Sequence, residues 1–341
     1  MPKELPSGGK FTDSGAAMGV EIIGTGHFVP GKPIKNDDLS RVMDTSDEWI
    51  RTRTGIRERR FCDSTETSAS LGIDASQKAL AAAGITADEI DVIICATVTP
   101  DHMCPQNACA IHAALGCRPI PAFDLVAACT GFIYSLSVAE HFIRGGSAKN
   151  VLVVGADVLS RTIDMTDRNT CILFGDGAGA AVLSARQAPA VGIRSIKIFA
   201  DGGPGHLITV PGMVTQQPAN SCATQHDYIR LNGREVFRFA VRRMIELTQE
   251  AILECRELGV ELDLLIPHQV NQRIIDAALE TTGFPASKVM VNLDKYGNTS
   301  AASVPIALDE AIREGRAKTG DTILLVAFGG GLTWGSCIIT L

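Results

Sequence analysis

The chain has 341 residues, of which 45% are hydrophobic and 20% charged, and its formal net charge is −7. This composition is typical of a globular protein with an ample core, and the length predicts two subdomains or a duplicated fold. The negative charge argues against general nucleic-acid binding, and no apolar run is long enough to span a membrane.

The N-terminus and the cysteines indicate the compartment. Residues 1–17 are polar and rich in Gly and Ser, so they lack the apolar stretch of a secretion signal, and we expect a flexible extension. The ten cysteines are scattered without a C-x-x-C pair, so no zinc or other metal site is expected. Single thiols in apolar segments are typical of a reducing compartment, and a cytoplasmic location is predicted.

Apolar strands alternate with helical segments along the first half. Uninterrupted β-branched runs between helices predict a parallel sheet that is covered on both faces. The predicted strands and helices are residues 20–23, 68–83, 91–97, 122–126, 133–144 and 151–155.

Residues 44–60 stand apart from this pattern, because they hold five arginines and one of only two tryptophans. Most charge runs are solvated loops. Arginines beside Trp49, however, can pair with and stack on a phosphorylated, ring-bearing ligand, and this interpretation is favoured here.

The same order of elements recurs in the second half, with Asn298 placed before a helix as Cys129 is in the first. This recurrence predicts an internal duplication, with halves at 18–187 and 188–341 and with Cys129 and Asn298 at equivalent places. Chance similarity between two βαβ units is the alternative. The predicted elements are residues 235–258, 263–266, 304–314 and 322–326.

Cys129 lies between a buried strand and a helix. The unpaired amides and the positive dipole end of a helix favour a thiolate there, which predicts a nucleophile, although most single cysteines only pack. His268 follows directly on the predicted strand 263–266, at the strand end where open α/β folds bind ligands. With Asn298 it supplies two hydrogen-bond donors for an enolate or a thioester oxyanion. The loop Phe328–Leu332 holds three glycines whose amides can approach a ligand.

A dinucleotide site is not expected at Phe174–Ala180, because the glycine spacing is wrong and a strand follows. The functional segments instead resemble the β-ketoacyl-acyl carrier protein synthase III family, which has the thiolase fold. The resemblance runs in register from about Met18 to Leu341. The motifs that carry it are Ala128–Phe132, Pro267–Asn271, Tyr296–Ser303 and Phe328–Gly335.

The resemblance implies a duplicated five-layer α/β/α/β/α fold, with two mixed sheets around buried helices, and a homodimer. It implies that Cys129 takes an acyl group from acyl-CoA, and that His268 and Asn298 stabilise the enolate from malonyl-acyl carrier protein. The backbone amides of Cys129 and Gly330 would hold the oxyanion. We expect the pKa of Cys129 to be moderately lowered, because its sulfur must also leave. No cofactor is implied.

Further residues carry family roles by position. Trp49, Arg53 and Arg168 match the CoA-binding residues, while Phe174 and Phe328 would line the channel. Two positions depart from the family pattern: Cys104 stands where the partner subunit closes the acyl pocket, and Arg234 replaces a smaller polar residue at the pantetheine channel.

The acidic carrier protein has a predicted docking surface. Arg234, Arg238 and Arg242 recur at four-residue spacing and form a basic stripe on one helix, and Arg273 follows the histidine motif. A solvated face is the plain alternative, above all for Arg242.

Three other functions compete with fatty acid chain initiation. One is a synthase of secondary metabolism with another acyl primer, and another is a non-catalytic acyl-thioester binding protein. A degradative thiolase is disfavoured, because it needs a second cysteine in a C-terminal glycine loop, and Cys337 lies beyond that loop.

Overall fold

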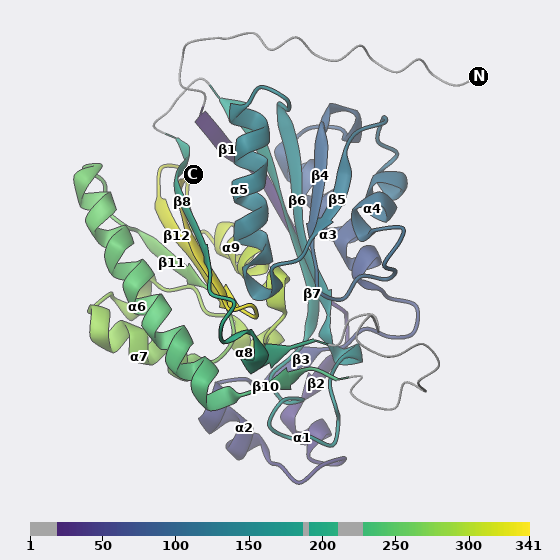
Figure 1. Cartoon of the computed structure of the whole chain (residues 1–341), viewed down its shortest axis with the longest axis vertical. Helices are drawn as coiled ribbons and strands as arrows, with labels where there is room; N and C mark the ends of the chain where they lie inside the picture. Colours follow the sequence, from purple (N-terminus) through teal and green to yellow (C-terminus); the bar gives the residue numbers. More distant parts are fainter. Residues whose placement is uncertain (1–18, 187–190, 211–227) are drawn as a thin grey trace.

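A computed structural model describes residues 19–186, 191–210 and 228–341, and Figure 1 shows its arrangement. The first sheet has the order β1-β7-β6-β4-β5. Strand β4 runs parallel to β5 and β6, whereas β7 runs antiparallel to both β6 and β1. These strands are β1 (Gly19–Phe28), β4 (Val92–Ala96), β5 (Ala122–Leu125), β6 (Asn150–Val158) and β7 (Asp176–Arg186).

The second sheet, of order β11-β12-β13-β8, repeats these pairings. Strand β11 is parallel to β12, and β13 is antiparallel to β12 and β8. A parallel bridge from Leu265 to Val289 takes the place that β5 has in the first sheet. The strands are β8 (Gly192–Ala200), β11 (Leu264–Pro267), β12 (Thr322–Gly329) and β13 (Thr333–Thr340).

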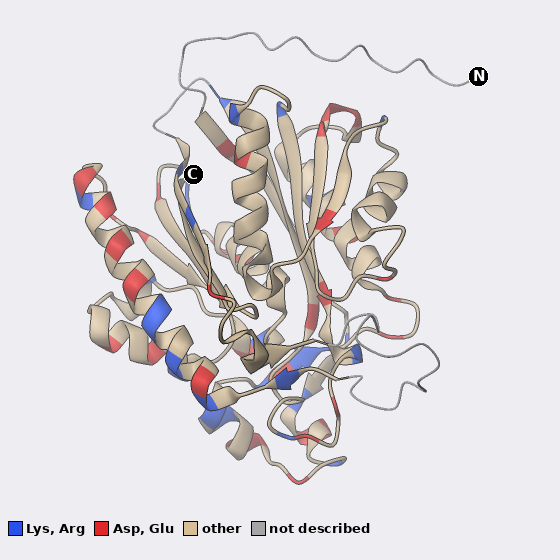
Figure 2. Ribbon diagram, viewed as in Figure 1, with Lys and Arg blue, Asp and Glu red and all other residues tan. Residues whose placement is uncertain are grey.

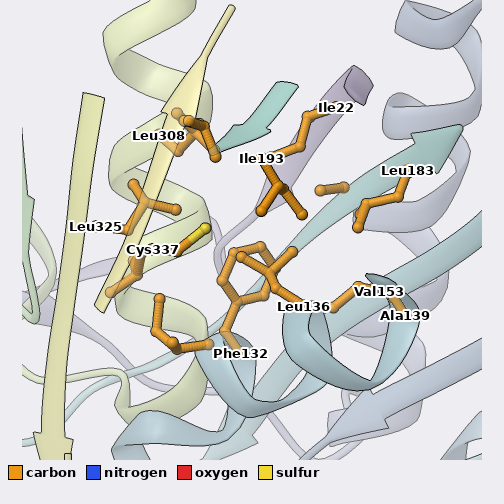
Figure 3. Packing of buried hydrophobic residues seen from close by; sticks show 14 of the residues in the cluster. Ile22, Phe132, Leu136, Ala139, Val153, Leu183, Ile193, Leu308, Leu325 and Cys337 are labelled. Atoms are coloured by element: carbon orange, nitrogen blue, oxygen red, sulfur yellow. The ribbon is translucent and has the colours of Figure 1, made fainter. Parts of the chain in front are cut away.

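Two helices lie between the sheets, α5 (Gly131–Arg144) and α9 (Ser303–Arg313). Their side chains form one buried cluster with strands of both sheets, including Phe132, Leu136 and Leu308 (Figure 3). Helices α3 (Ser68–Ala83) and α4 (Asn107–Leu115) cover the outer face of the first sheet. Helices α6 (Gly233–Glu257) and α7 (Gln272–Thr282) cover that of the second. The predicted five-layer fold with two mixed sheets is therefore confirmed.

The parallel pairing predicted from the apolar runs holds for β4, β5 and β6, whereas β7 and β13 run antiparallel to their neighbours and make both sheets mixed. Strands β7 and β13 are buried over most of their length, because helices cover both faces of each sheet whatever the strand direction.

Smaller elements lie across the lower end of the sheets in Figure 1, where the parallel strands end and α5 and α9 begin. No helix in the described ranges is both long and apolar enough to cross a membrane. The predicted extension 1–17 and the predicted boundary between 187 and 188 lie outside the described residues, so both stay predictions. The smaller elements are α1 (Asn36–Leu39), α2 (Asp47–Thr54), α8 (Leu293–Tyr296), β2 (Pro33–Lys35), β3 (Glu58–Arg60), β9 (Ile208–Thr209) and β10 (Arg230–Leu231).

Candidate active site

An apolar pocket opens at this lower end, and both halves of the chain line it. Cys129, His268 and Asn298 all lie on its wall, so the structure brings the three predicted catalytic residues together. Phe174 and Phe328, predicted as channel residues, line it as well. Most of the remaining lining is aliphatic, so polar groups in the pocket meet few competing water molecules.

Cys129 sits in the short turn Ala128–Thr130 that leads into α5. Ala128 holds φ = 46°, a left-handed conformation that is uncommon for a residue with a side chain. The end of β12 approaches so closely that a Cβ on Gly329 would lie 2.8 Å from the Cys129 nitrogen. The absence of a side chain at Gly329 therefore lets the glycine loop reach the nucleophile. Gly330 lines the same pocket, which is compatible with the predicted oxyanion hole.

The second half repeats this turn at Ser300–Ala302, where Ser300 has φ = 52°. Cys129 is thus equivalent to Ala301, and the predicted equivalence of Cys129 with Asn298 is wrong. The spacing from Asp91 to Cys129 is the same as that from Asp263 to Ala301. Asn298 instead belongs to the loop that precedes the turn.

His268 follows directly on β11, and its backbone nitrogen donates to the Val326 carbonyl over 2.7 Å. Its ring stands edge-on to Phe328, with centroids 5.6 Å apart. Its Nδ1 lies 2.6 Å from the Ser303 hydroxyl, a partner that the sequence analysis did not single out. Burial lowers the pKa of His268 from 6.5 to about 3, so the imidazole is neutral.

The orientation of Asn298 is set by two backbone contacts. Its nitrogen donates to the Leu173 carbonyl over 2.8 Å, and its side-chain oxygen accepts the Ser300 amide over 2.8 Å. Because Oδ1 is occupied, the NH2 group is the end of the side chain that is left to donate into the pocket.

The expected lowering of the Cys129 pKa is wrong for this structure. Burial, with a smaller effect of the Asp157 carboxylate, raises the pKa of the thiol to about 12, although a hydrogen bond with Ser300 lowers it in part. An apolar pocket disfavours a thiolate more than the short turn favours it. The resting nucleophile is therefore a thiol.

Asp157 is a buried residue of β6 that the sequence analysis did not select. Its Oδ1 accepts hydrogen bonds from the Val98 amide at 2.8 Å and the Thr99 hydroxyl at 2.9 Å. Its Oδ2 accepts the Ala301 amide at 3.2 Å, so this carboxylate joins the two halves beside the nucleophile.

The predicted CoA-binding residues also gather in one place. The guanidinium of Arg53 lies 4.2 Å from the Trp49 ring centroid, and that of Arg168 lies 5.1 Å from it. Ser46 caps helix α2, which carries Trp49 and Arg53, and Arg168 is held at the ring by the Asp44 carbonyl over 2.7 Å. Two cations at one aromatic ring match the ligand chemistry predicted for this segment.

Two family models match the chain. Residues 123–202 match the model of 3-oxoacyl-(acyl-carrier-protein) synthase III, and residues 259–341 match the model of its C-terminal part. The beta-ketoacyl-(acyl-carrier-protein) synthase III of Escherichia coli is 48% identical over 322 residues, which cover 94% of this chain and 99% of that protein. The chain belongs to the 3-oxoacyl-(acyl-carrier-protein) synthase III family. It is accordingly an acyltransferase of the condensing class.

Solved structures agree with this synthase III assignment. That of 3-oxoacyl-(acyl-carrier-protein) synthase III from Aquifex aeolicus has a TM-score of 0.86 and 47% identity, and covers 95% of this chain and 100% of its own. A priming β-ketosynthase from a polyketide biosynthetic pathway has a TM-score of 0.87 and 34% identity, with coverages of 94% and 96%.

Other residues with expected synthase III roles lie outside the pocket. Cys104 is exposed and does not line it, so its predicted role needs a second subunit. Arg238 and Arg242 are exposed on α6 and pair with Glu235 and Glu246 of the same helix, at 3.0 and 2.8 Å.

Arg234 and Arg273 are exposed near the starts of α6 and α7. The ribbon in Figure 2 marks Lys and Arg mainly in the first half of α6 and Asp and Glu mainly in the second. The carrier-protein surface stays a prediction.

Proposed function

We propose that this chain condenses an acyl-CoA primer with malonyl-acyl carrier protein and so starts a fatty acid chain. The observation that carries the proposal is one apolar pocket that is lined by a thiol from the first half of the chain and by a neutral imidazole and an amide from the second. A thiol can accept an acyl group, and two neutral donors can stabilise an enolate oxygen.

In the first step the Cys129 sulfur attacks the thioester carbonyl of acyl-CoA. The new carbon–sulfur bond replaces the one to CoA, and the thiol proton of Cys129 ends on the departing CoA sulfur. Trp49, Arg53 and Arg168 would hold the CoA nucleotide, while the amides of Cys129 and Gly330 would stabilise the oxyanion.

In the second step malonyl-acyl carrier protein loses carbon dioxide. His268 and Asn298 donate to the oxygen of the enolate that remains, and the enolate carbon attacks the acyl carbonyl on Cys129. The bond to sulfur breaks, the Cys129 thiolate takes a proton from water, and 3-oxoacyl-acyl carrier protein leaves. Neither step uses a metal or a cofactor, so dialysis against a chelator should not change the rate.

Intact-protein mass spectrometry after incubation with acyl-CoA tests the first step. We expect an acyl adduct on the wild type and none on Cys129→Ala. His268→Ala and Asn298→Ala should still form the adduct but lose decarboxylation of malonyl-acyl carrier protein by roughly 100-fold or more. A wild type without adduct would show a non-catalytic thioester-binding protein instead.

The primer decides between two condensing functions. The likeness to the priming β-ketosynthase of a polyketide pathway favours a specialised pathway as the second candidate. A series of acyl-CoAs of increasing length and branching, used in the same adduct assay, separates the two functions: preference for acetyl-CoA supports fatty acid initiation. We propose a cytoplasmic location for this activity.

A homodimer is part of the proposal. Strand β5 is an edge strand of the described first sheet, and two large apolar side chains nearby, Met103 and Val126, are 66% and 75% exposed. Exposed apolar groups beside an unpaired strand edge are typical of an interface. Sedimentation or light scattering should give the mass of two chains.

A further inference from the structure

The Ser303 hydroxyl makes a direct contact with the catalytic imidazole. Its oxygen lies 2.6 Å from Nδ1 of His268, and Ser303 and His268 are only 2% and 1% exposed. Ser303 is the first residue of α9, which is packed between the two sheets. The hydroxyl is therefore fixed by a rigid element and does not move with a loop.

The protons of this pair can be assigned. His268 is neutral, because burial lowers its pKa to about 3, so only one ring nitrogen carries a hydrogen. A buried hydroxyl must also donate its own hydrogen to avoid the cost of an unsatisfied group. Among the described residues, the structure records no hydrogen bond of the Ser303 hydroxyl except the one with Nδ1. The hydroxyl thus donates to Nδ1, and the ring hydrogen is on Nε2.

We propose that Ser303 is a positioning residue that holds His268 in the tautomer with its hydrogen on Nε2, so that the ring donates a hydrogen bond to the substrate. The inference rests on the proposed function, because only the enolate step needs that donor. Asn298 is oriented in the same way, through the Ser300 amide on its Oδ1. The segment 298–303 therefore sets the donor direction of both groups.

This assignment also separates the two steps. An imidazole that carries its hydrogen on Nε2 has no lone pair there with which to take the Cys129 proton. Acylation of Cys129 should accordingly tolerate the loss of Ser303, whereas decarboxylation should not.

The test compares Ser303→Ala and Ser303→Thr with the wild type. In Ser303→Ala we expect kcat for decarboxylation of malonyl-acyl carrier protein to fall roughly 100-fold, with KM nearly unchanged and Cys129 acylation kept. Ser303→Thr, which keeps the hydroxyl, should recover most of the rate. Ser76→Ala is the matched control, since its buried hydroxyl donates to the Gly72 carbonyl at 2.6 Å away from the pocket.

Nitrogen NMR of histidine-labelled protein gives a readout that does not depend on activity. We expect the wild-type His268 to carry its hydrogen on Nε2, and Ser303→Ala to shift the ring toward the other tautomer. A wild-type ring protonated on Nδ1, or unchanged decarboxylation in Ser303→Ala, would overturn the proposal. A wild type that forms no acyl adduct would overturn the proposed function, whereas the tautomer measurement would still test Ser303.

Discussion

His268 and Cys129 are both held in their uncharged forms, and the apolar pocket is the cause. Burial lowers the pKa of the imidazole to about 3 and raises the pKa of the thiol to about 12. An uncharged pair suits thioester exchange followed by decarboxylation, because His268 serves as a donor and need not be an imidazolium. An ion pair, by contrast, would favour a permanently reactive thiolate.

The buried imidazole makes stability depend on pH. The pKa of His268 lies near 3 in the folded chain and at its ordinary 6.5 when unfolded, so the unfolded state binds the proton first as pH falls. Above pH 6.5, neutral His268 makes its full contribution to the free energy of unfolding. This contribution is lost as pH falls from 6.5 toward 3.

We expect urea unfolding of the wild type to show a decline in stability from about pH 7 to about pH 5, and His268→Gln to show a shallower one. Equal slopes in the two proteins would contradict the burial of a neutral histidine.

Single-residue roles could be predicted in part. Cys129 and His268 were found because they follow closely on predicted strands, and Asn298 because it was expected at the entry of a helix. The structure places Asn298 in the loop before that entry, yet all three line one pocket. The direction of the Cys129 pKa was missed, because burial by residues distant in sequence has no local pattern. Ser303 ends the motif Tyr296–Ser303, but a small residue in a run of small residues shows no role of its own, and Asp157 lies within an apolar strand.

At the level of elements, the arginine-rich segment 44–60 divides into two parts. Helix α2 carries Trp49 and the exposed Arg53, whose guanidinium lies 4.2 Å from the Trp49 ring centroid, and their role as a ligand site stays a prediction. Strand β3 instead buries Arg59, whose guanidinium donates to Asn36 Oδ1 at 2.8 Å and to the Ile172 carbonyl at 2.9 Å. The spacing of arginines along the chain cannot show which of them point inward.

This division predicts opposite effects for two substitutions in one segment. Arg59→Ala leaves buried acceptors unpaired and should lower the free energy of unfolding by about 3 kcal/mol or more. Arg53→Ala removes an exposed side chain and should change stability by less than about 0.5 kcal/mol, while raising KM for acyl-CoA. Denaturant unfolding and steady-state kinetics measure both. If Arg53→Ala unfolded the protein and left KM for acyl-CoA unchanged, Arg53 would be a structural residue and not a CoA-binding one.

Helix ends were predicted better than strand directions. Helix α3 spans Ser68–Ala83 as expected, because Gly84 ends it in the left-handed conformation at φ = 66°. Strand direction has no such local marker when both faces are buried, and therefore the antiparallel strands β7 and β13 were not predicted from the residues alone.

For the whole molecule, the charge distribution bears on the partner. The chain is acidic overall, yet Arg234, Arg238 and Arg242 gather on the first half of α6. Arg273 lies close in sequence to His268, and no ion pair of its side chain is recorded within the described ranges. A local basic surface on an acidic protein can attract an acidic carrier while the rest of the surface repels it.

Charge reversal tests this surface. Arg238→Glu and Arg273→Glu should each raise KM for malonyl-acyl carrier protein roughly 10-fold, because they lose an attraction and add a repulsion, and should leave KM for acyl-CoA unchanged. Arg242→Glu should have an effect similar to that of Arg238→Glu, since both arginines are exposed and each pairs with a glutamate of its own helix.

The control is Arg256→Glu, in the exposed last turn of the same helix and away from the basic half. It changes the net charge by the same amount and should leave both KM values as they are. The difference between Arg273→Glu and the wild type should shrink as salt is raised toward about 1 M, where charge attraction is screened within a few ångströms. Equal losses with both substrates, or an equal loss in Arg256→Glu, would show that net charge and not this surface governs the encounter.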